Sequence, residues 1–320
     1  ILGITVLVEA VGATLLFIAF ERSIPDAGRR LYYSIFHSIS GFCNAGFSLF
    51  STSLETFCDN ALLLLTMCAL IVTGGLGFVV LMELFSPYTW FGGPRRKRRF
   101  SVHTRYVVLI TAILIVVGAA VILVTERGST ALGETLPQRA LNALFQSVTA
   151  RTAGFNTLNI GALSSATVFA MIVLMFIGAS PGSTGGGIKT TTVACLWAAV
   201  VASLRNRPHV EIHRRTIPAE TVYKAMTLLC VSLAVVVLFT LALLSTERQP
   251  FLDVLFEVVS AFGTVGLSMG LTPELSDAGR LLITLLMLIG RLGPLTVAYA
   301  MLPSHAKVNY RYAEERIMIG

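Results

Sequence analysis

Three short segments of the chain share one pattern: a polar residue, a small residue, a glycine and a bulky apolar residue. The glycines are Gly46, Gly154 and Gly266, which are spaced by 108 and then 112 residues. A single copy would indicate only a tight turn, but repetition at this period predicts three equivalent loops around one axis. Backbone carbonyls gathered in this way can replace the water around a dehydrated cation. The spacing therefore indicates a cation site built from loops.

The elements that must position these loops are apolar helices. Of the 320 residues, 55% are hydrophobic and 13% are charged, and the charged share is about half that of ordinary globular domains. Apolar runs of ~20 residues cross the ~30 Å core of a bilayer as helices, and a soluble core would not hold so many of them. We predict an all-α, multi-pass protein of the cell membrane with spans over 2–20, 60–84, 106–125, 164–179, 190–204, 222–245 and 278–302.

Two basic clusters, within residues 94–105 and 205–218, fix the predicted topology. Each adjoins apolar spans, so we interpret both as cytoplasmic loops under the positive-inside rule and expect no nucleic-acid partner. Each repeat then reads as an outward helix, a half-helix too short to cross, a glycine-bearing loop and a return helix. The half-helices are expected over 31–41, 138–149 and 251–261. Their negative C-terminal ends would face the loops and favour a cation.

A glycine-rich segment interrupts the return span of the second repeat. A helix cannot propagate through it, and the stretch from 164 to 204 is too long for one crossing, so a broken helix is expected. A phosphate-binding loop is disfavoured because Ile188 separates the last glycine from the lysine. A flexible kink without function is the other alternative. The residues of the interruption are Gly182, Ser183, Thr184, Gly185, Gly186, Gly187 and Lys189.

Together, the three loops, the segment PGSTGGGIKT and the segment GRLGPLT resemble the Trk/Ktr/HKT superfamily of potassium transporters, most closely the Ktr-type membrane subunit. The resemblance runs through essentially the whole chain. It implies four helix–pore-loop–helix units in pseudo-fourfold arrangement around one potassium pathway. Three are visible here, at 1–93, 94–218 and 219–302, followed by a cytoplasmic tail at 303–320. We expect a first unit to precede Ile1, and three units alone should not form a working filter.

The resemblance also implies roles for individual residues. The filter glycines would be Gly46, Gly154 and Gly266. Residues 182–187 and Lys189 would form an intramembrane gate below the filter, and Arg291 would be a charge facing the pore rather than one reaching the inner surface. The predicted filter carbonyls are those of Cys43, Asn44, Ala45, Arg151, Thr152, Ala153, Gly263, Thr264 and Val265.

The remaining predictions concern function and partners. The resemblance implies a potassium-translocating subunit, not an enzyme, that works down the electrochemical gradient as a homodimer with a cytosolic, nucleotide-binding regulatory ring of the RCK type. The basic loop 94–105 and the tail 303–320 would dock that ring. Potassium would be the substrate, no cofactor is expected to be bound covalently, and nucleotide is expected only on the partner. The alternative is a sodium- or proton-coupled carrier, or symporter, of another solute, although the loops lack acids. A membrane enzyme would need a clustered polar site, which is not apparent.

Several charged and polar residues of the helices and loops carry predictions of their own. Arg151 is expected to pin the end of a half-helix or to pair with an acid, and Glu257 is a candidate partner for it. His37 is expected to make a structural hydrogen bond, and Glu83 to reach the inner interface. Five cysteines without a paired motif imply neither a disulfide framework nor a metal site.

Overall fold

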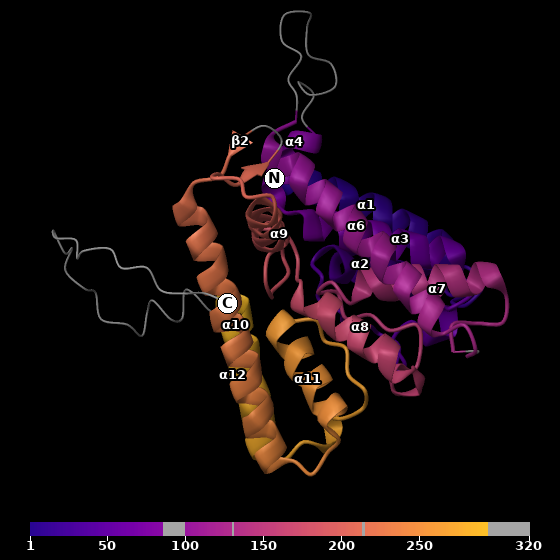
Figure 1. Ribbon diagram of the computed structural model, residues 1–320. Helices are drawn as coiled ribbons and strands as arrows, with labels where there is room; N and C mark the ends of the chain where they lie inside the picture. The colour runs from indigo at the N-terminus through magenta and orange to yellow at the C-terminus, as the bar shows by residue number, and fades with distance from the viewer. Residues whose placement is uncertain (86–99, 130, 213–214, 294–320) are drawn as a thin grey trace, which may run out of the picture.

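The computed structural model describes residues 1–85, 100–129, 131–212 and 215–293. Along them the chain passes three times through one order of elements (Figure 1): a long helix, a short helix, a turn of 3-10 helix and a return helix. The long helices are α1 (Leu2–Ala19), α6 (Val102–Thr125) and α10 (Ala219–Thr246). The short helices are α2 (Ala27–Phe42), α7 (Leu136–Thr149) and α11 (Phe251–Gly263). The turns are η1 (Glu55–Phe57), η2 (Ile160–Ala162) and η3 (Thr272–Glu274).

The return helices differ from one repeat to the next. They are α3 (Ala61–Leu76) followed by α4 (Phe78–Leu84), α8 (Ser165–Phe176) followed by α9 (Thr190–Leu204), and α12 (Asp277–Leu292). An antiparallel hairpin of β1 (Glu211–Ile212) and β2 (Arg215–Thr216) joins α9 to α10. The break between α8 and α9 lies where the glycine-rich segment predicts it.

The return span predicted over 60–84 is not one straight helix. The chain bends by 108° between α3 and α4 at Gly77, which has a φ of 87°. A methyl group at Gly77 would lie 2.5 Å from the carbonyl oxygen of Pro181, and the amide of Phe78 donates to the carbonyl of Gly182 over 3.1 Å. The glycine-rich segment therefore occupies the space into which α3 would otherwise continue.

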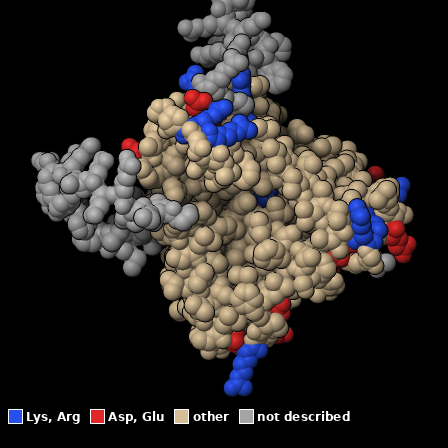
Figure 2. Space-filling model, viewed as in Figure 1, with Lys and Arg blue, Asp and Glu red and all other residues tan. Residues whose placement is uncertain are grey.

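By length and composition, α1, α6 and α10 are each able to cross a membrane, and the bent pair α3–α4 passes the same test when taken together. In the space-filling view the charged side chains gather at the top, at the right edge and at the bottom of the molecule (Figure 2), with a broad band of uncharged residues between the top and the other two. This distribution fits a protein that spans a bilayer, because a charge inside the hydrocarbon core is costly.

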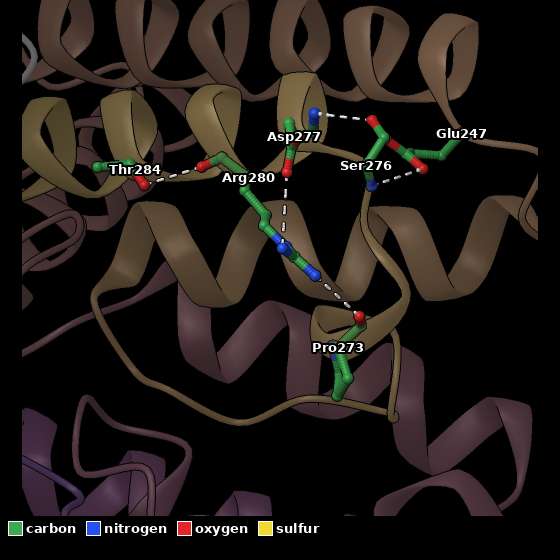
Figure 3. Close-up of polar contacts among 7 residues, drawn as sticks. Glu247, Pro273, Ser276, Asp277, Arg280 and Thr284 are labelled. Atoms are coloured by element: carbon green, nitrogen blue, oxygen red, sulfur yellow. Dashed lines mark hydrogen bonds and ion pairs between the residues drawn. The ribbon is translucent and has the colours of Figure 1, made fainter.

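Glutamates at the ends of two long helices cap the return helices. Glu126, which follows α6, accepts hydrogen bonds from the amide of Ser164 at 2.7 Å and the hydroxyl of Thr167 at 2.6 Å. Glu247, which follows α10, accepts one from the hydroxyl of Ser276 at 2.5 Å (Figure 3). Ser164 and Ser276 are the N-cap residues of α8 and α12. A carboxylate at a helix N-terminus satisfies free amides and is favoured by the helix dipole.

Two large apolar clusters form most of the described core, beside a small third one of Leu76, Val80 and Val107. One packs α8, α10, α11 and α12 around Phe256 and Phe262, and the other packs α1, α2, α3 and α7 around Phe20 and Phe145. Each cluster encloses a short helix, so α11 and α2 are held from several sides. This packing fixes the C-terminal ends of the short helices, where the glycine loops begin.

Candidate functional site

The three glycine loops meet in space. A methyl group at Gly46 would lie 2.6 Å from the carbonyl oxygen of Ala153, and one at Gly154 would lie 2.1 Å from that of Val265. Gly46, Gly154 and Gly266 all have a positive φ, of 74°, 80° and 91°. Only glycine combines that conformation with so close an approach of two backbones. The prediction that the loops lie together is confirmed within the described residues.

The same local conformation recurs in each loop. The polar residue two positions before each glycine is also left-handed, with φ of 50° at Asn44, 74° at Thr152 and 51° at Thr264. A left-handed conformation is uncommon for any residue except glycine and is costly unless the surroundings enforce it. Three equivalent exceptions indicate one geometry imposed three times.

One hydroxyl residue near the C-terminus of each short helix holds the loop in place. These residues are Ser40, Thr149 and Ser260. Each accepts a backbone hydrogen bond from the residue before the glycine, and its hydroxyl donates to the carbonyl of the residue after the glycine. The backbone bonds measure 2.9, 3.0 and 2.8 Å. The hydroxyl bonds, to Phe47, Phe155 and Leu267, measure 2.8, 2.7 and 2.6 Å.

These bonds leave the predicted filter carbonyls free for another ligand. Within the described part of the chain, no hydrogen bond is donated to the carbonyls of Cys43, Asn44, Ala45, Arg151, Thr152, Ala153, Gly263, Thr264 or Val265. Backbone carbonyls inside a protein are nearly always paired. A dehydrated cation is the ligand that a ring of such oxygens suits.

The side chains of the polar loop residues contact one another and the glycine-rich segment. The amide of Asn44 lies 3.3 Å from the hydroxyl oxygen of Thr152. The amide of Gly186 donates to the hydroxyl of Thr264 over 3.1 Å, and a methyl group at Gly185 would lie 2.2 Å from the hydroxyl oxygen of Thr152. The glycine-rich segment therefore packs directly against two of the three loops.

Two cations hold the glycine-rich segment from outside the loops. The ammonium of Lys189 donates to the carbonyl of Gly185 over 2.6 Å, and the guanidinium of Arg291 donates to the carbonyl of Thr184. Arg291 lies near the end of α12, 107 residues along the chain from Thr184. The structure thus brings Arg291 to the segment that the sequence singled out.

The two hydroxyl residues of the glycine-rich segment, Ser183 and Thr184, differ in their hydrogen bonds. Ser183 bonds locally, to the carbonyl of Ser180 at 2.6 Å. The hydroxyl oxygen of Thr184 is buried and has no partner among the described residues. Within the described residues, neither hydroxyl donates a hydrogen bond across to a glycine loop in this conformation.

A second polar row lies behind the loops, and only part of it could be predicted from the sequence. Each short helix carries one buried polar residue that bonds a hydroxyl just beyond the glycine loop. The pairs are His37 with Ser48 at 3.1 Å, Gln146 with Thr157 at 3.2 Å, and Glu257 with Ser268 at 2.8 Å. The structural hydrogen bond expected of His37 is present. Three chemically different side chains do the same task. His37 and Glu257 each lie nine residues before their glycine but Gln146 lies eight before its own, so an alignment on the glycines does not superpose the three.

Arg151 does not pair with Glu257. Among the described residues, the carboxylate of Glu257 accepts hydrogen bonds from the hydroxyls of Ser268 and Thr272. Arg151 is buried, with 7% of its surface exposed, and its Nε has no partner within the described residues.

Glu83 accepts hydrogen bonds from the amide and hydroxyl of Ser101 at the start of α6, so it holds together the two helices on either side of residues 86–99. Residues 94–99, which are half of the predicted docking loop 94–105, and all of the tail 303–320 lie outside the described residues.

Comparison with known proteins adds to this geometry. The family model TrkH, described as a cation transport protein, matches residues 1–310. The chain is 39% identical to the potassium/sodium uptake protein NtpJ of Enterococcus hirae, over 100% of the chain and 71% of that protein. It is 38% identical to the Ktr system potassium uptake protein B of Vibrio alginolyticus, over 98% of the chain and 68% of the relative. The same protein of Bacillus subtilis is 38% identical over 98% and 69%.

A solved structure agrees with the fold. The crystal structure of the potassium transporter TrkH from Vibrio parahaemolyticus superposes with a TM-score of 0.70 at 21% identity, covering 91% of this chain and 62% of that one. The resemblance deduced from the three loops is confirmed, and the family consists of membrane transport proteins rather than enzymes. With its three glycine loops, its broken return helix and a family match over residues 1–310, the chain belongs to the TrkH family of cation transport proteins.

Proposed function

We propose that the chain is the translocating subunit of a potassium uptake system and that potassium passes through the ring of glycine loops, down its electrochemical gradient. The observation that carries this proposal is the meeting of three loops with nine carbonyls that receive no hydrogen bond from the described residues. The names of the Ktr relatives, which specify potassium uptake, support the choice of ion. A fourth loop, expected from the resemblance, would complete the ring.

A substitution at one glycine tests the filter. In the full-length protein we expect Gly154→Ser to abolish most rubidium uptake by cells that lack other potassium systems. The new side chain would meet the carbonyl of Val265, and φ is positive at this position. Gly128→Ser is the matched control, because Gly128 has nothing within 4 Å of a new Cβ. Normal uptake by the Gly154 variant at equal membrane abundance would refute the filter assignment.

The choice between potassium and sodium can be measured in the same assay. The Enterococcus relative is named for uptake of both ions, so rubidium uptake is measured with increasing external sodium. A potassium filter predicts little competition by sodium at concentrations at which potassium competes fully. Equal competition would favour a cation pathway without this selectivity, and a strict requirement for sodium would favour the coupled carrier.

We further propose that residues 182–187 form the gate of this pathway. Contacts with Thr152 and Thr264 on one side, and with Arg291 and Lys189 on the other, support this role. Deleting 182–187 is expected to raise potassium flux at equal membrane abundance. Unchanged or lower flux in a variant that still reaches the membrane would contradict the gate.

Regulation and assembly complete the proposal. The repeats bounded at 1–93, 94–218 and 219–302 would form one subunit of a homodimer, and a cytosolic nucleotide-binding ring would act on the gate. The bend at Gly77 supports a mechanical connection between the docked ring and the gate, because α4 contacts the gate segment at Gly182 and leads directly into the basic loop. Copurification of the full-length protein with its regulatory partner, before and after neutralising residues 95–99, tests this docking.

A further inference from the structure

A groove on the surface between α6 and α9 combines an apolar lining with arginines at one end. The cavity has a volume of about 360 Å³. Its apolar wall includes Leu109 and Ile113 of α6 and Trp197 and Val201 of α9. Its mouth is lined by Arg205, at the C-terminal end of α9, together with the nearby loop and hairpin.

The groove faces outward from the protein. Trp197 is 68% exposed, although it lies in the apolar helix α9, and Leu109 and Ile113 are each 46% exposed. Large apolar side chains exposed on a membrane-spanning surface are solvated by lipid. Tryptophan is also enriched near the membrane interface, where its ring has an apolar body and a polar N–H.

The charges at the mouth are mostly positive. The side chain of Arg205 has no partner among the described residues, whereas Arg207 lies 3.6 Å from Glu211 in an exposed ion pair. Arg215 lines a second cavity of about 320 Å³ that shares Tyr106 and Ala194 with the first. The space-filling view shows basic side chains gathered at this end of the molecule, above the uncharged band (Figure 2).

We propose that this groove binds an anionic phospholipid, with its phosphate between Arg205 and Arg207 and an acyl chain along Trp197. Both halves of the ligand follow from the lining: cationic groups at the cytoplasmic surface attract anionic headgroups, and the apolar groove accepts a chain. Eight residues of helix separate Trp197 from Arg205, which is about 12 Å along the axis. That separation places the indole beside the upper part of the acyl chain when the phosphate is at the arginines.

Quenching of Trp197 fluorescence by brominated lipids tests the site. The full-length protein is reconstituted with phosphatidylglycerol or phosphatidylcholine carrying brominated acyl chains, and the signal of Trp197 is obtained as the difference from Trp197→Phe. We expect stronger quenching by brominated phosphatidylglycerol. Arg205→Gln together with Arg207→Gln should lower the preference for the anionic lipid by about thirty-fold, or roughly fivefold per arginine.

Matched controls lie at the opposite ends of α6 and α10. Arg127→Gln and Arg248→Gln remove exposed charges there and should leave the preference unchanged. Equal quenching by both lipids in the unsubstituted protein would overturn the proposal. So would a preference that survives the double substitution, or the absence of quenching by either lipid, which would mean that a second protein chain covers the groove. These outcomes are independent of ion transport, which serves only to show that each variant is folded.

Discussion

Arg291 provides the sharpest test of how the pathway is closed. Its guanidinium donates to the carbonyl of Thr184 within the gate segment. A hydrogen bond from a charged group contributes about 1.5–3 kcal/mol, and about 1.4 kcal/mol is a tenfold change in an equilibrium. Because Arg291 is exposed, we take the lower end of the range. We therefore expect Arg291→Gln to raise the ratio of displaced to seated gate about tenfold.

The assay is rubidium flux into proteoliposomes that contain the full-length protein without regulatory partner, normalised to reconstituted protein. When the seated gate predominates, flux should rise by about the same factor as the ratio. Arg280→Gln is the matched control on the same helix. Arg280 also donates to a carbonyl, that of Pro273 at 3.2 Å, and lies 3.6 Å from Asp277, but at the far end of α12 from the gate (Figure 3).

Two results would refute the reasoning about Arg291. One is flux equal to that of the unsubstituted protein, and the other is an equal rise in the Arg280 variant. Arg291→Lys separates contact from charge, because lysine keeps the charge but lacks the planar fork of arginine. A higher rubidium flux in both Arg291 variants supports the contact with Thr184, whereas a higher flux in the glutamine variant alone indicates an electrostatic barrier.

Two further predictions concern the filter and the helix caps. Ser260→Ala removes the hydroxyl that holds the carbonyl of Leu267 and should reduce discrimination between rubidium and sodium; Ser245→Ala, which removes an exposed hydroxyl on α10, should not. Burial raises the pKa of Glu126, but hydrogen bonds from Thr167 and its neighbours outweigh this and lower the pKa below its ordinary value. At a pH above its ordinary pKa the carboxylate therefore stabilises the fold, and this stabilisation is lost as the pH falls through the lowered pKa. The difference in Tm between the unsubstituted protein and Glu126→Gln should therefore shrink on acidification.

The repeated loops could be predicted because their signals are local. Glycine is the residue that adopts a positive φ at low cost, and three glycines at matching places identify three backbone turns without knowledge of their surroundings. The long helices follow from apolar runs, and the short ones from runs too brief to cross the bilayer. The interruption at 182–187 is equally local, because closely spaced glycines next to a proline together lower helix propensity enough to end a helix.

Other features needed the packed structure. The row formed by His37, Gln146 and Glu257 shares no residue type, so no motif announces it. Asn44 and Thr152 meet although they are 108 residues apart, and a sequence does not state which of its polar residues become neighbours. The suggested pair of Arg151 and Glu257 was wrong for this reason, since nearer hydroxyls already satisfy the glutamate.

By itself, the sequence determined that this is a multi-pass helical protein with three glycine loops, a broken return helix and a family resemblance that the comparisons confirm. These properties depend on local backbone preferences and on the length of apolar runs. Only the tertiary structure decided that the gate segment packs against Thr152 and Thr264, that Arg291 reaches it from α12, and that α3 bends at Gly77 to make room. Those contacts join segments far apart in the chain, and they depend on how the helices pack.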